Sequence, residues 1–240
     1  MKQILLISFL SLAVLSSCRM LSSRSEHGDG NVISQTRNFS GFNGVEVGGA
    51  IDVYVTSDSN YSVKVETDQN LQEFVDVFMD GNTLRIGNKD YTNVEPSGQI
   101  KVYVSGPAFS KLGASGASNI YSTGRLTSSS RLDIDLSGAC SVKLDIKAPE
   151  VEVEMSGACN AELTGETKDL RVDGSGSTGL KAFGLLAENV DVDLSGAGDA
   201  EVYASVKLNA GTSGAASIEY KGTASVSTDI SGAGSVKKVD

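Results

Sequence analysis

Apolar and polar residues alternate strictly from residue 111 onward, which is the period of an extended chain. A Ser-Gly pair recurs within this pattern, with spacings of 22, 19, 19, 20, 18 and 18 residues, at Ser115, Ser137, Ser156, Ser175, Ser195, Ser213 and Ser231. The positions one and three before each serine and five after it are mostly apolar, and in an extended chain they point to the same side. The residues between them, which point to the other side, are mostly polar. Each repeat is therefore predicted to be a strand pair with one buried face and a bend at the glycine.

A period of this size is typical of stacked supersecondary units. One unit cannot bury its apolar side alone, but stacked units form a continuous core with backbone pairing between them. We therefore predict an all-β fold, in which residues 111–240 form a parallel β-helix or solenoid with rungs of about 19 residues. The recurring glycine is expected at a position that needs a positive φ or a close backbone approach.

Residues 36–110 lack the repeat and are predicted to be an N-terminal β-sheet block that caps the first rung. Two alternating segments, Ile51–Thr56 and Tyr61–Thr67, read as strands, and Gln99–Ser105 reads as a third. The sequence VDVFMDGNTLRIGN predicts a hairpin around Asp80-Gly81-Asn82. Asn70–Phe78 is compatible with a short helix, but a strand is favoured. Together the block and the repeat form one continuous domain over residues 36–240.

The first 17 residues carry Lys2 and then an apolar run, Ile4–Leu15, that is too short to cross a bilayer. The run ends in Leu-Ser-Ser-Cys, so residues 1–17 resemble a bacterial lipoprotein signal peptide with Cys18 as the lipidated residue. An ordinary secretory signal is the alternative. Residues 18–35 are predicted to be the lipidated cysteine and a flexible tether. Arg19 after the cysteine is not acidic, which favours the outer membrane over the inner one, on a face that the sequence does not identify.

The formal net charge is −10, which argues against a nucleic-acid partner. The chain contains a single histidine, His27, and it falls in the predicted tether. A Ser-His-Asp arrangement near the repeat is therefore excluded by composition, and we expect no enzyme, no catalytic residues and no cofactor.

Acidic residues stand two positions before several motif serines, so stacking would place them in one column. The column contains Asp135, Glu154, Asp173 and Asp193. Such a column is either a solvated acidic face or, less favoured, a set of calcium ligands.

Cys140 and Cys159 each lie three residues after a motif serine and share the parity of the core. Other repeats have small residues in this slot, which predicts buried cysteines on adjacent rungs. Stacked rungs bring Cα atoms within the range of a disulfide, so the sequence leaves open a disulfide or, as we favour, two free thiols. Within the repeat no further Cys or His is present for a zinc site, since Cys18 and His27 precede it.

Several segments together resemble the bacterial family called putative auto-transporter adhesin, head GIN domain. They are the opening from Phe39 to Val45, the hairpin DGNTLRIGN, the strand IKVYVSGPAFSKLGASGASNI and the Ser-Gly-Ala recurrences, and the resemblance spans about residues 39–236. It implies a β-helical, lipid-anchored or secreted envelope protein and carries no agreed catalytic residues.

The expected function is accordingly that of a non-catalytic, lipid-anchored cell-envelope protein, an adhesin or binding scaffold. The alternative is a carbohydrate-binding or carbohydrate-active β-helix acting on an envelope or host glycan. Expected partners are the membrane, through the lipid anchor, and a glycan or protein ligand. A second copy could also pair with the uncapped strand edge at Ser231–Val239.

Overall fold

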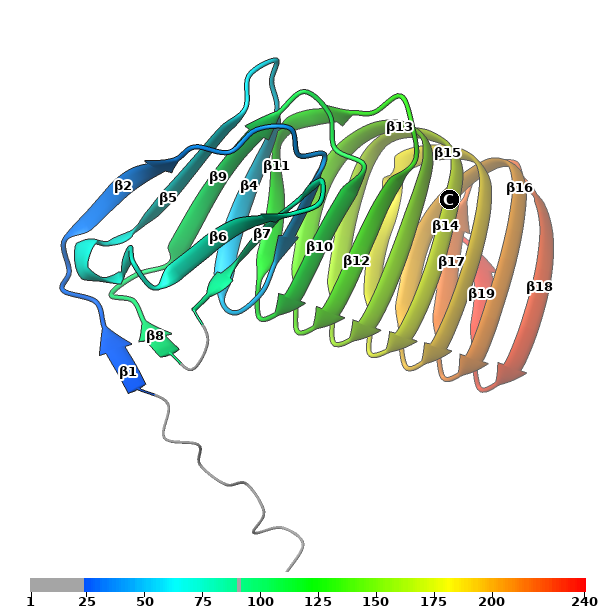
Figure 1. Ribbon diagram of the computed structural model, residues 1–240. Helices are drawn as coiled ribbons and strands as arrows, with labels where there is room; N and C mark the ends of the chain where they lie inside the picture. The colour runs from blue at the N-terminus through cyan, green and yellow to red at the C-terminus, as the bar shows by residue number, and fades with distance from the viewer. Residues whose placement is uncertain (1–23, 90–91) are drawn as a thin grey trace, which may run out of the picture.

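The computed structural model describes residues 24–89 and 92–240. This part of the chain forms nineteen strands and one 3₁₀ helix (Figure 1). The N-terminal elements are β1 (Arg24–His27), β2 (Val32–Arg37), β3 (Gly44–Val47), β4 (Ile51–Ser57), β5 (Ser62–Asp68), η2 (Gln69–Leu71), β6 (Val75–Asp80), β7 (Thr83–Asn88), β8 (Thr92–Glu95) and β9 (Ile100–Gly106). The repeat contributes β10 (Lys111–Gly116), β11 (Asn119–Thr127), β12 (Leu132–Gly138), β13 (Ser141–Gly157), β14 (Asn160–Gly176), β15 (Gly179–Gly196), β16 (Asp199–Gly214), β17 (Ser217–Lys221), β18 (Ser225–Gly232) and β19 (Ser235–Lys238).

The repeat is a parallel β-solenoid, as predicted. One face, here called the serine face, consists of β3, β10, β12, the second halves of β13 to β16, and β18. The other, here called the return face, consists of β4, β11, the first halves of β13 to β16, β17 and β19. Figure 1 shows the rungs stacked side by side along one axis.

The motif serines stack directly on one another, each in register with the serine of the next rung. The Ser-Gly spacing therefore measures the length of a rung. Where a rung is longer, the extra residues do not pair with the neighbouring strand and the register shifts. The register shifts between Tyr121 and Arg125 on β11, and between Ala182 and Leu186 on β15.

The core lies between the two faces. The apolar residues that precede the motif serines by three positions are at most 1% exposed in four successive rungs, at Ile134, Val153, Val172 and Val192. The residues five positions after the serines are at most 2% exposed from Ile120 to Ile218. The positions that are apolar in the alternating sequence pattern are thus the positions that are buried in the core.

Residues 36–110 form the predicted cap. β7 pairs in parallel with β3, and β9 pairs in parallel with β4, so the stacking begins inside this block. Beyond these strands the pairing becomes antiparallel, through β6 on one side and through β5 and β2 on the other. The change of direction ends the solenoid at the end where β2 and β6 lie in Figure 1.

The predicted strands of this block are present, with two refinements. β6 and β7 form the hairpin around Gly81-Asn82. β4 and β5 do not pair with each other, because β9 lies between them. The favoured strand over 70–78 is wrong in its first half, where η2 and a turn precede β6.

The prediction of a flexible tether up to residue 35 is wrong for its second half. β1 pairs with β8, and β2 pairs with β5 along six residue pairs from Val32↔Asp68 to Arg37↔Val63. These polar residues form strands because β5 and β8 offer them unpaired backbone groups. The predicted signal peptide 1–17, Cys18 and the first part of the tether lie outside the described residues.

A buried carboxylate fixes the turn between β1 and β2. Asp68 is 1% exposed and accepts hydrogen bonds from Gly30 N (2.8 Å), Ser97 N (2.9 Å) and Ser97 Oγ (2.6 Å). The bond from the Ser97 hydroxyl is the main cause that lowers the pKa of Asp68, against the opposing effect of burial. This carboxylate joins three segments of the cap that are distant in sequence.

The far end of the solenoid is exposed. β18 pairs with β16, β19 pairs with β17, and every residue of β18 is exposed, including Val226 (37%) and Ile230 (45%). Pairing of a second copy with this edge stays a prediction.

Each corner between the faces depends on the motif glycine. The seven glycines from Gly116 to Gly232 have φ between 72° and 107°. A Cβ on any of them would lie 2.5 to 2.8 Å from the carbonyl oxygen of the corner glycine one rung earlier. Both expectations for this glycine, a positive φ and a close backbone approach, are confirmed.

We predict that Gly157→Ala lowers the free energy of unfolding by about 2–4 kcal/mol, because alanine disfavours this φ and its Cβ would meet Gly138 O at 2.5 Å. Urea unfolding followed by circular dichroism measures the change. The matched control is Gly98→Ala, where a Cβ meets nothing within 4 Å. Equal stability of the two variants would contradict this account of the corner.

Candidate functional site

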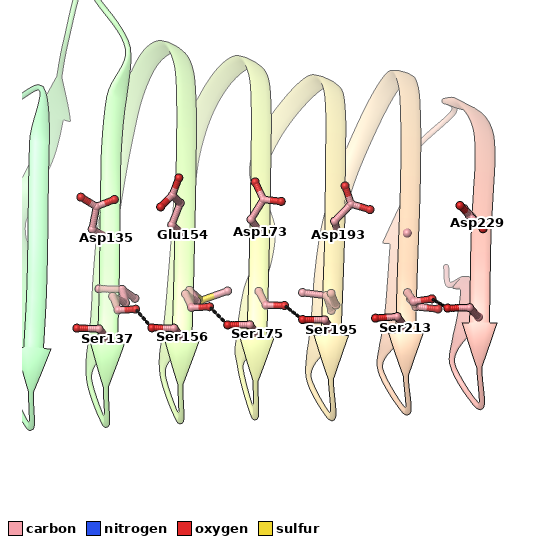
Figure 2. Close-up of a pocket in the computed structure, with 17 residues that line it drawn as sticks. Asp135, Ser137, Glu154, Ser156, Asp173, Ser175, Asp193, Ser195, Ser213 and Asp229 are labelled. Carbon is pink, nitrogen blue, oxygen red and sulfur yellow. Dashed lines mark hydrogen bonds between the residues drawn. The ribbon is translucent and has the colours of Figure 1, made fainter.

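A groove of about 590 Å³ runs along the outside of the serine face. Figure 2 shows two columns of side chains in it, which come from β12 to β16 and β18. The acid column consists of Asp135, Glu154, Asp173, Asp193 and Asp229. The serine column consists of Ser137, Ser156, Ser175, Ser195, Ser213 and Ser231. The four acids predicted from the sequence are therefore brought together, on neighbouring strands.

The column follows from the register, because Asp135 pairs with Glu154, Glu154 with Asp173, and Asp173 with Asp193. Rungs stacked about 4.8 Å apart place like charges at that spacing. Gly211 then interrupts the column before Asp229. Unpaired carboxylates at this distance repel one another unless water, salt or a cation screens them.

Two basic residues screen part of the column. Lys111 Nζ lies 2.9 Å from Glu46 and 3.2 Å from Asp135, so it spans the rung where Gly113 has no side chain. These contacts, led by the bond to Glu46, raise the pKa of Lys111. Arg171 contacts Asp173 at 3.0 Å and Glu152 at 3.6 Å.

Asp193 stands where the acids are most crowded. Although Asp193 is exposed, partial desolvation is the main cause that raises its pKa, followed by the negative charges of Asp191 and Asp173. Arg171 works in the opposite direction. The acid column therefore has a charge-compensated end at Asp135 and a charge-strained region around Asp193.

Within residues 24–89 and 92–240, no group of three or more His, Cys, Asp or Glu side chains is placed to hold a metal ion. The reason is geometric, because in-register strands project their carboxylates side by side rather than toward one point (Figure 2). Calcium binding by Asp135, Glu154, Asp173 and Asp193 stays a prediction that this geometry does not favour.

The serine hydroxyls serve the backbone. Ser195 Oγ donates to Gly174 O (3.3 Å) and Ser231 Oγ donates to Thr212 O (3.3 Å), in each case one rung earlier. His27 lies on β1, outside the groove, where its Nδ1 is 3.0 Å from Glu95 Oε2. The groove therefore presents repeated hydroxyls and carboxylates rather than one nucleophile beside one base.

Both cysteines are buried free thiols, at 2% exposure for Cys140 and 0% for Cys159. The disulfide that the sequence left open is not formed. Cys140 Sγ donates to Ser137 O (3.0 Å), and Cys159 Sγ donates to Ser156 O (3.2 Å), so each thiol bonds within its own corner. Burial is the main cause that raises the pKa of Cys140. The slot takes any small residue, and Ser118, Thr178 and Ala216 are buried there in other rungs.

Sequence reasoning missed Lys111 and Arg171. Both occupy the position four before a motif serine, in a row shared with Asp133, Glu152 and Asp191. Comparing that row with the acid column would have predicted that Lys111 and Arg171 lie beside the acids. Cys18, the predicted lipidation site, lies outside the described residues.

The family model described as putative auto-transporter adhesin, head GIN domain, matches residues 41–224. No curated protein matches the chain. A crystal structure of a putative adhesin from Bacteroides fragilis is similar, with a TM-score of 0.83 and 21% identity, over 89% of this chain and 100% of that one.

Two further crystal structures are similar over 90% of this chain and 100% of theirs. One is a putative adhesin from Parabacteroides merdae, with a TM-score of 0.71 and 20% identity. The other is a putative lipid binding protein from Parabacteroides distasonis, with a TM-score of 0.70 and 23% identity. At these identities the likenesses show the fold alone. Within the described residues, no helix has the length and apolar character needed to cross a bilayer.

We predict that a Cys18→Ser chain has two thiols that react with a disulfide reagent after denaturation without reductant, and that both react slowly in the native protein. Burial and the raised pKa of Cys140 suppress the native reaction. Absorbance of the released thiolate counts the reacting groups. A count of zero after denaturation would establish a disulfide instead.

Asp193→Asn is predicted to stabilise the fold by at most about 1 kcal/mol at pH 7, because these exposed carboxylates are screened by water and salt. The pKa of Asp193 is raised in the folded state, so its charge costs stability above the unfolded pKa of about 3.9. The gain should vanish as the pH falls below that value and shrink in 1 M salt. Thermal unfolding as a function of pH measures it.

The matched variant is Asp135→Asn, which removes a partner of Lys111 and is expected to destabilise the fold by a similar small amount. The diagnostic result is that the two substitutions change the free energy of unfolding in opposite directions. Destabilisation by Asp193→Asn at pH 7 would mean that an attractive contact, and not repulsion, dominates at that position.

Proposed function

The chain belongs to the family described as putative auto-transporter adhesin, head GIN domain, and from this premise we propose that it is a non-catalytic protein of the cell envelope. Its solenoid presents a regular, rigid surface for adhesion or for binding a partner. Membership in this family and the likeness to solved structures named putative adhesins support an envelope or surface role.

The observation that carries the proposal is the repetition in the groove. Acid–base catalysis requires two groups whose environments differ, one proton donor and one acceptor. In the groove carboxylates recur at the same position of successive rungs, beside hydroxyls that are engaged with the backbone, and no one pair is set apart by its position. Such a surface suits multivalent contact along its length better than a reaction at one point.

We further propose that Cys18 is lipidated after removal of residues 1–17 and that the protein is held at the outer membrane. The support is the sequence alone, namely the apolar run Ile4–Leu15, the Leu-Ser-Ser-Cys box and Arg19 after it. Several acyl chains would provide stable anchoring, since each buried methylene contributes about 0.8 kcal/mol.

Carbohydrate binding is the second candidate function. A stack of three half-buried tyrosines on the return face favours it, since partly exposed aromatic rings are a common surface for sugars. A carbohydrate-active enzyme would also need one singular pair of carboxylates at a defined separation. The acids of the groove form a column of side-by-side carboxylates and do not provide such a pair.

We predict that the wild-type protein fractionates with membranes and that Cys18→Ser releases it to the soluble fraction. A membrane-impermeant amine reagent on intact cells should label the wild-type solenoid, whose lysines are exposed, for example Lys147 and Lys168. A stacked solenoid resists proteolysis, so amine labelling reports its location more directly than protease treatment does.

A periplasmic protein of the same cells is the control and must stay unlabelled. Labelling only after permeabilisation would exclude adhesion to an external surface. It would still be compatible with a binding scaffold in the periplasm. A Cys18→Ser protein that stays with the membranes would overturn the lipid anchor.

A further inference from the structure

Three tyrosines form a continuous stack on the outside of the return face. Tyr103 on β9, Tyr54 on β4 and Tyr121 on β11 are in register across adjacent strands. Their ring centroids are 5.2 and 5.3 Å apart, with interplanar angles of 20° and 29°. All three rings are half-buried, so the stack is an ordered aromatic surface on the side of the molecule away from the acid column.

The two ends of the stack differ. At the Tyr103 end, Lys64 Nζ lies 4.6 Å from the ring centroid and covers that face. At the other end, Tyr121 borders a pocket of about 640 Å³ on the side of β13. Lys143, the residue in register with Tyr121, turns its ammonium to Glu162 at 2.7 Å. Tyr54 also lines the pocket, so the open space runs along the outer edge of the stack and continues past Tyr121 toward β13 and β14.

A bulge in β11 creates this space, and hydrogen bonds fix it. The ladder between β11 and β13 shifts between Tyr121 and Arg125. Ser122 Oγ accepts a hydrogen bond from Asp145 N (2.9 Å), and Arg125 contacts Asp145 (2.9 Å) and Glu166 (3.3 Å). The pocket is thus formed in advance, which lowers the ordering cost of binding.

We propose that this pocket binds a carbohydrate, with one pyranose ring packed against Tyr121 at the end of the tyrosine stack. A pyranose has an apolar face of C–H bonds that packs against an aromatic ring, and hydroxyls at its rim that need polar partners. The pocket provides such partners in Ser122, Thr123, Lys143, Glu162 and Thr164.

An aromatic side chain of a peptide could also stack on Tyr121, but it would leave this polar rim without hydrogen bonds, which is costly once water is displaced. The positive charges of Lys143 and Arg125 are balanced by Glu162 and Asp145, so the pocket suits a neutral sugar better than a strongly charged one. The inference deepens the proposed binding role and rests on it.

The test uses the absence of tryptophan from the chain. Tyr121→Trp keeps an aromatic face and introduces the only indole, whose fluorescence reports on the pocket. The probes are cellohexaose, maltohexaose, xylohexaose and hexa-N-acetylchitohexaose. We expect at least one of them to change the indole emission in a saturable manner and to bind the unmodified protein by isothermal titration calorimetry.

Tyr121→Ala should then weaken binding of that sugar by about tenfold or more. Its thermal unfolding should stay close to wild type, since the ring is half-buried. The matched control is Tyr203→Ala, a tyrosine several rungs away on β16, which should leave the affinity unchanged. The double variant Lys143→Ala and Glu162→Ala should also weaken binding.

Three outcomes would overturn the proposal. They are no emission change with any of the four sugars, equal affinity of Tyr121→Ala and wild type, or a response to a Phe-Gly-Phe peptide where no sugar gives one. Sugar binding that is independent of Tyr121 would overturn this binding site but would still support the proposed binding function. A further outcome is sugar binding that depends on Tyr121 in a protein that the external amine reagent does not label. That result would support the binding site and contradict adhesion to an external surface.

Discussion

Hydrogen bonding between parallel, in-register rungs is the constraint on which the rest of the molecule depends. It holds successive rungs about 4.8 Å apart and repeats each side-chain position as a column. The corner shows the consequence most directly. Gly157 approaches Gly138 O so closely that a Cβ would lie 2.5 Å from it, and the same contact recurs at every corner from Gly116 to Gly232. The serine beside each glycine, the small residue at each turn and the apolar rows of the core follow from the same spacing.

The same spacing makes charge a problem, because identical acids must stand beside one another. The chain reduces the repulsion where it can, with Lys111 across Glu46 and Asp135 and with Arg171 beside Asp173. At Asp193 partial desolvation and the charges of Asp191 and Asp173 outweigh the opposing effect of Arg171, and the pKa of that carboxyl rises. On the return face the same geometry is favourable, because Lys143 and Glu162 alternate in sign and form an ion pair of 2.7 Å. A column thus stabilises or strains the fold according to its composition.

The solenoid could be predicted because the Ser-Gly recurrence marks the register directly, and each motif serine does pair with the next. The strands β1 and β2 could not, because their polar residues become ordered only by pairing with β8 and β5. The tyrosine stack was also missed, although its residues stand in the sequence. Tyr54 precedes Tyr103 and Tyr121 along the chain but lies between them in space, since β9 inserts on the capped side of β4. Sequence order equals stacking order in the repeat but not in the cap.

The two outer faces therefore differ in what they can bind. The serine face repeats one pattern over many rungs, so a partner gains affinity there by touching several equivalent positions, and an acidic polymer is repelled by its carboxylates. The return face is interrupted where the aromatic stack ends at Tyr121 and the bulge of β11 leaves room beside it. That place arises at the junction of cap and repeat, where the regular ladder is broken. In a molecule built from equal columns, specificity for a single small ligand can come only from such a break.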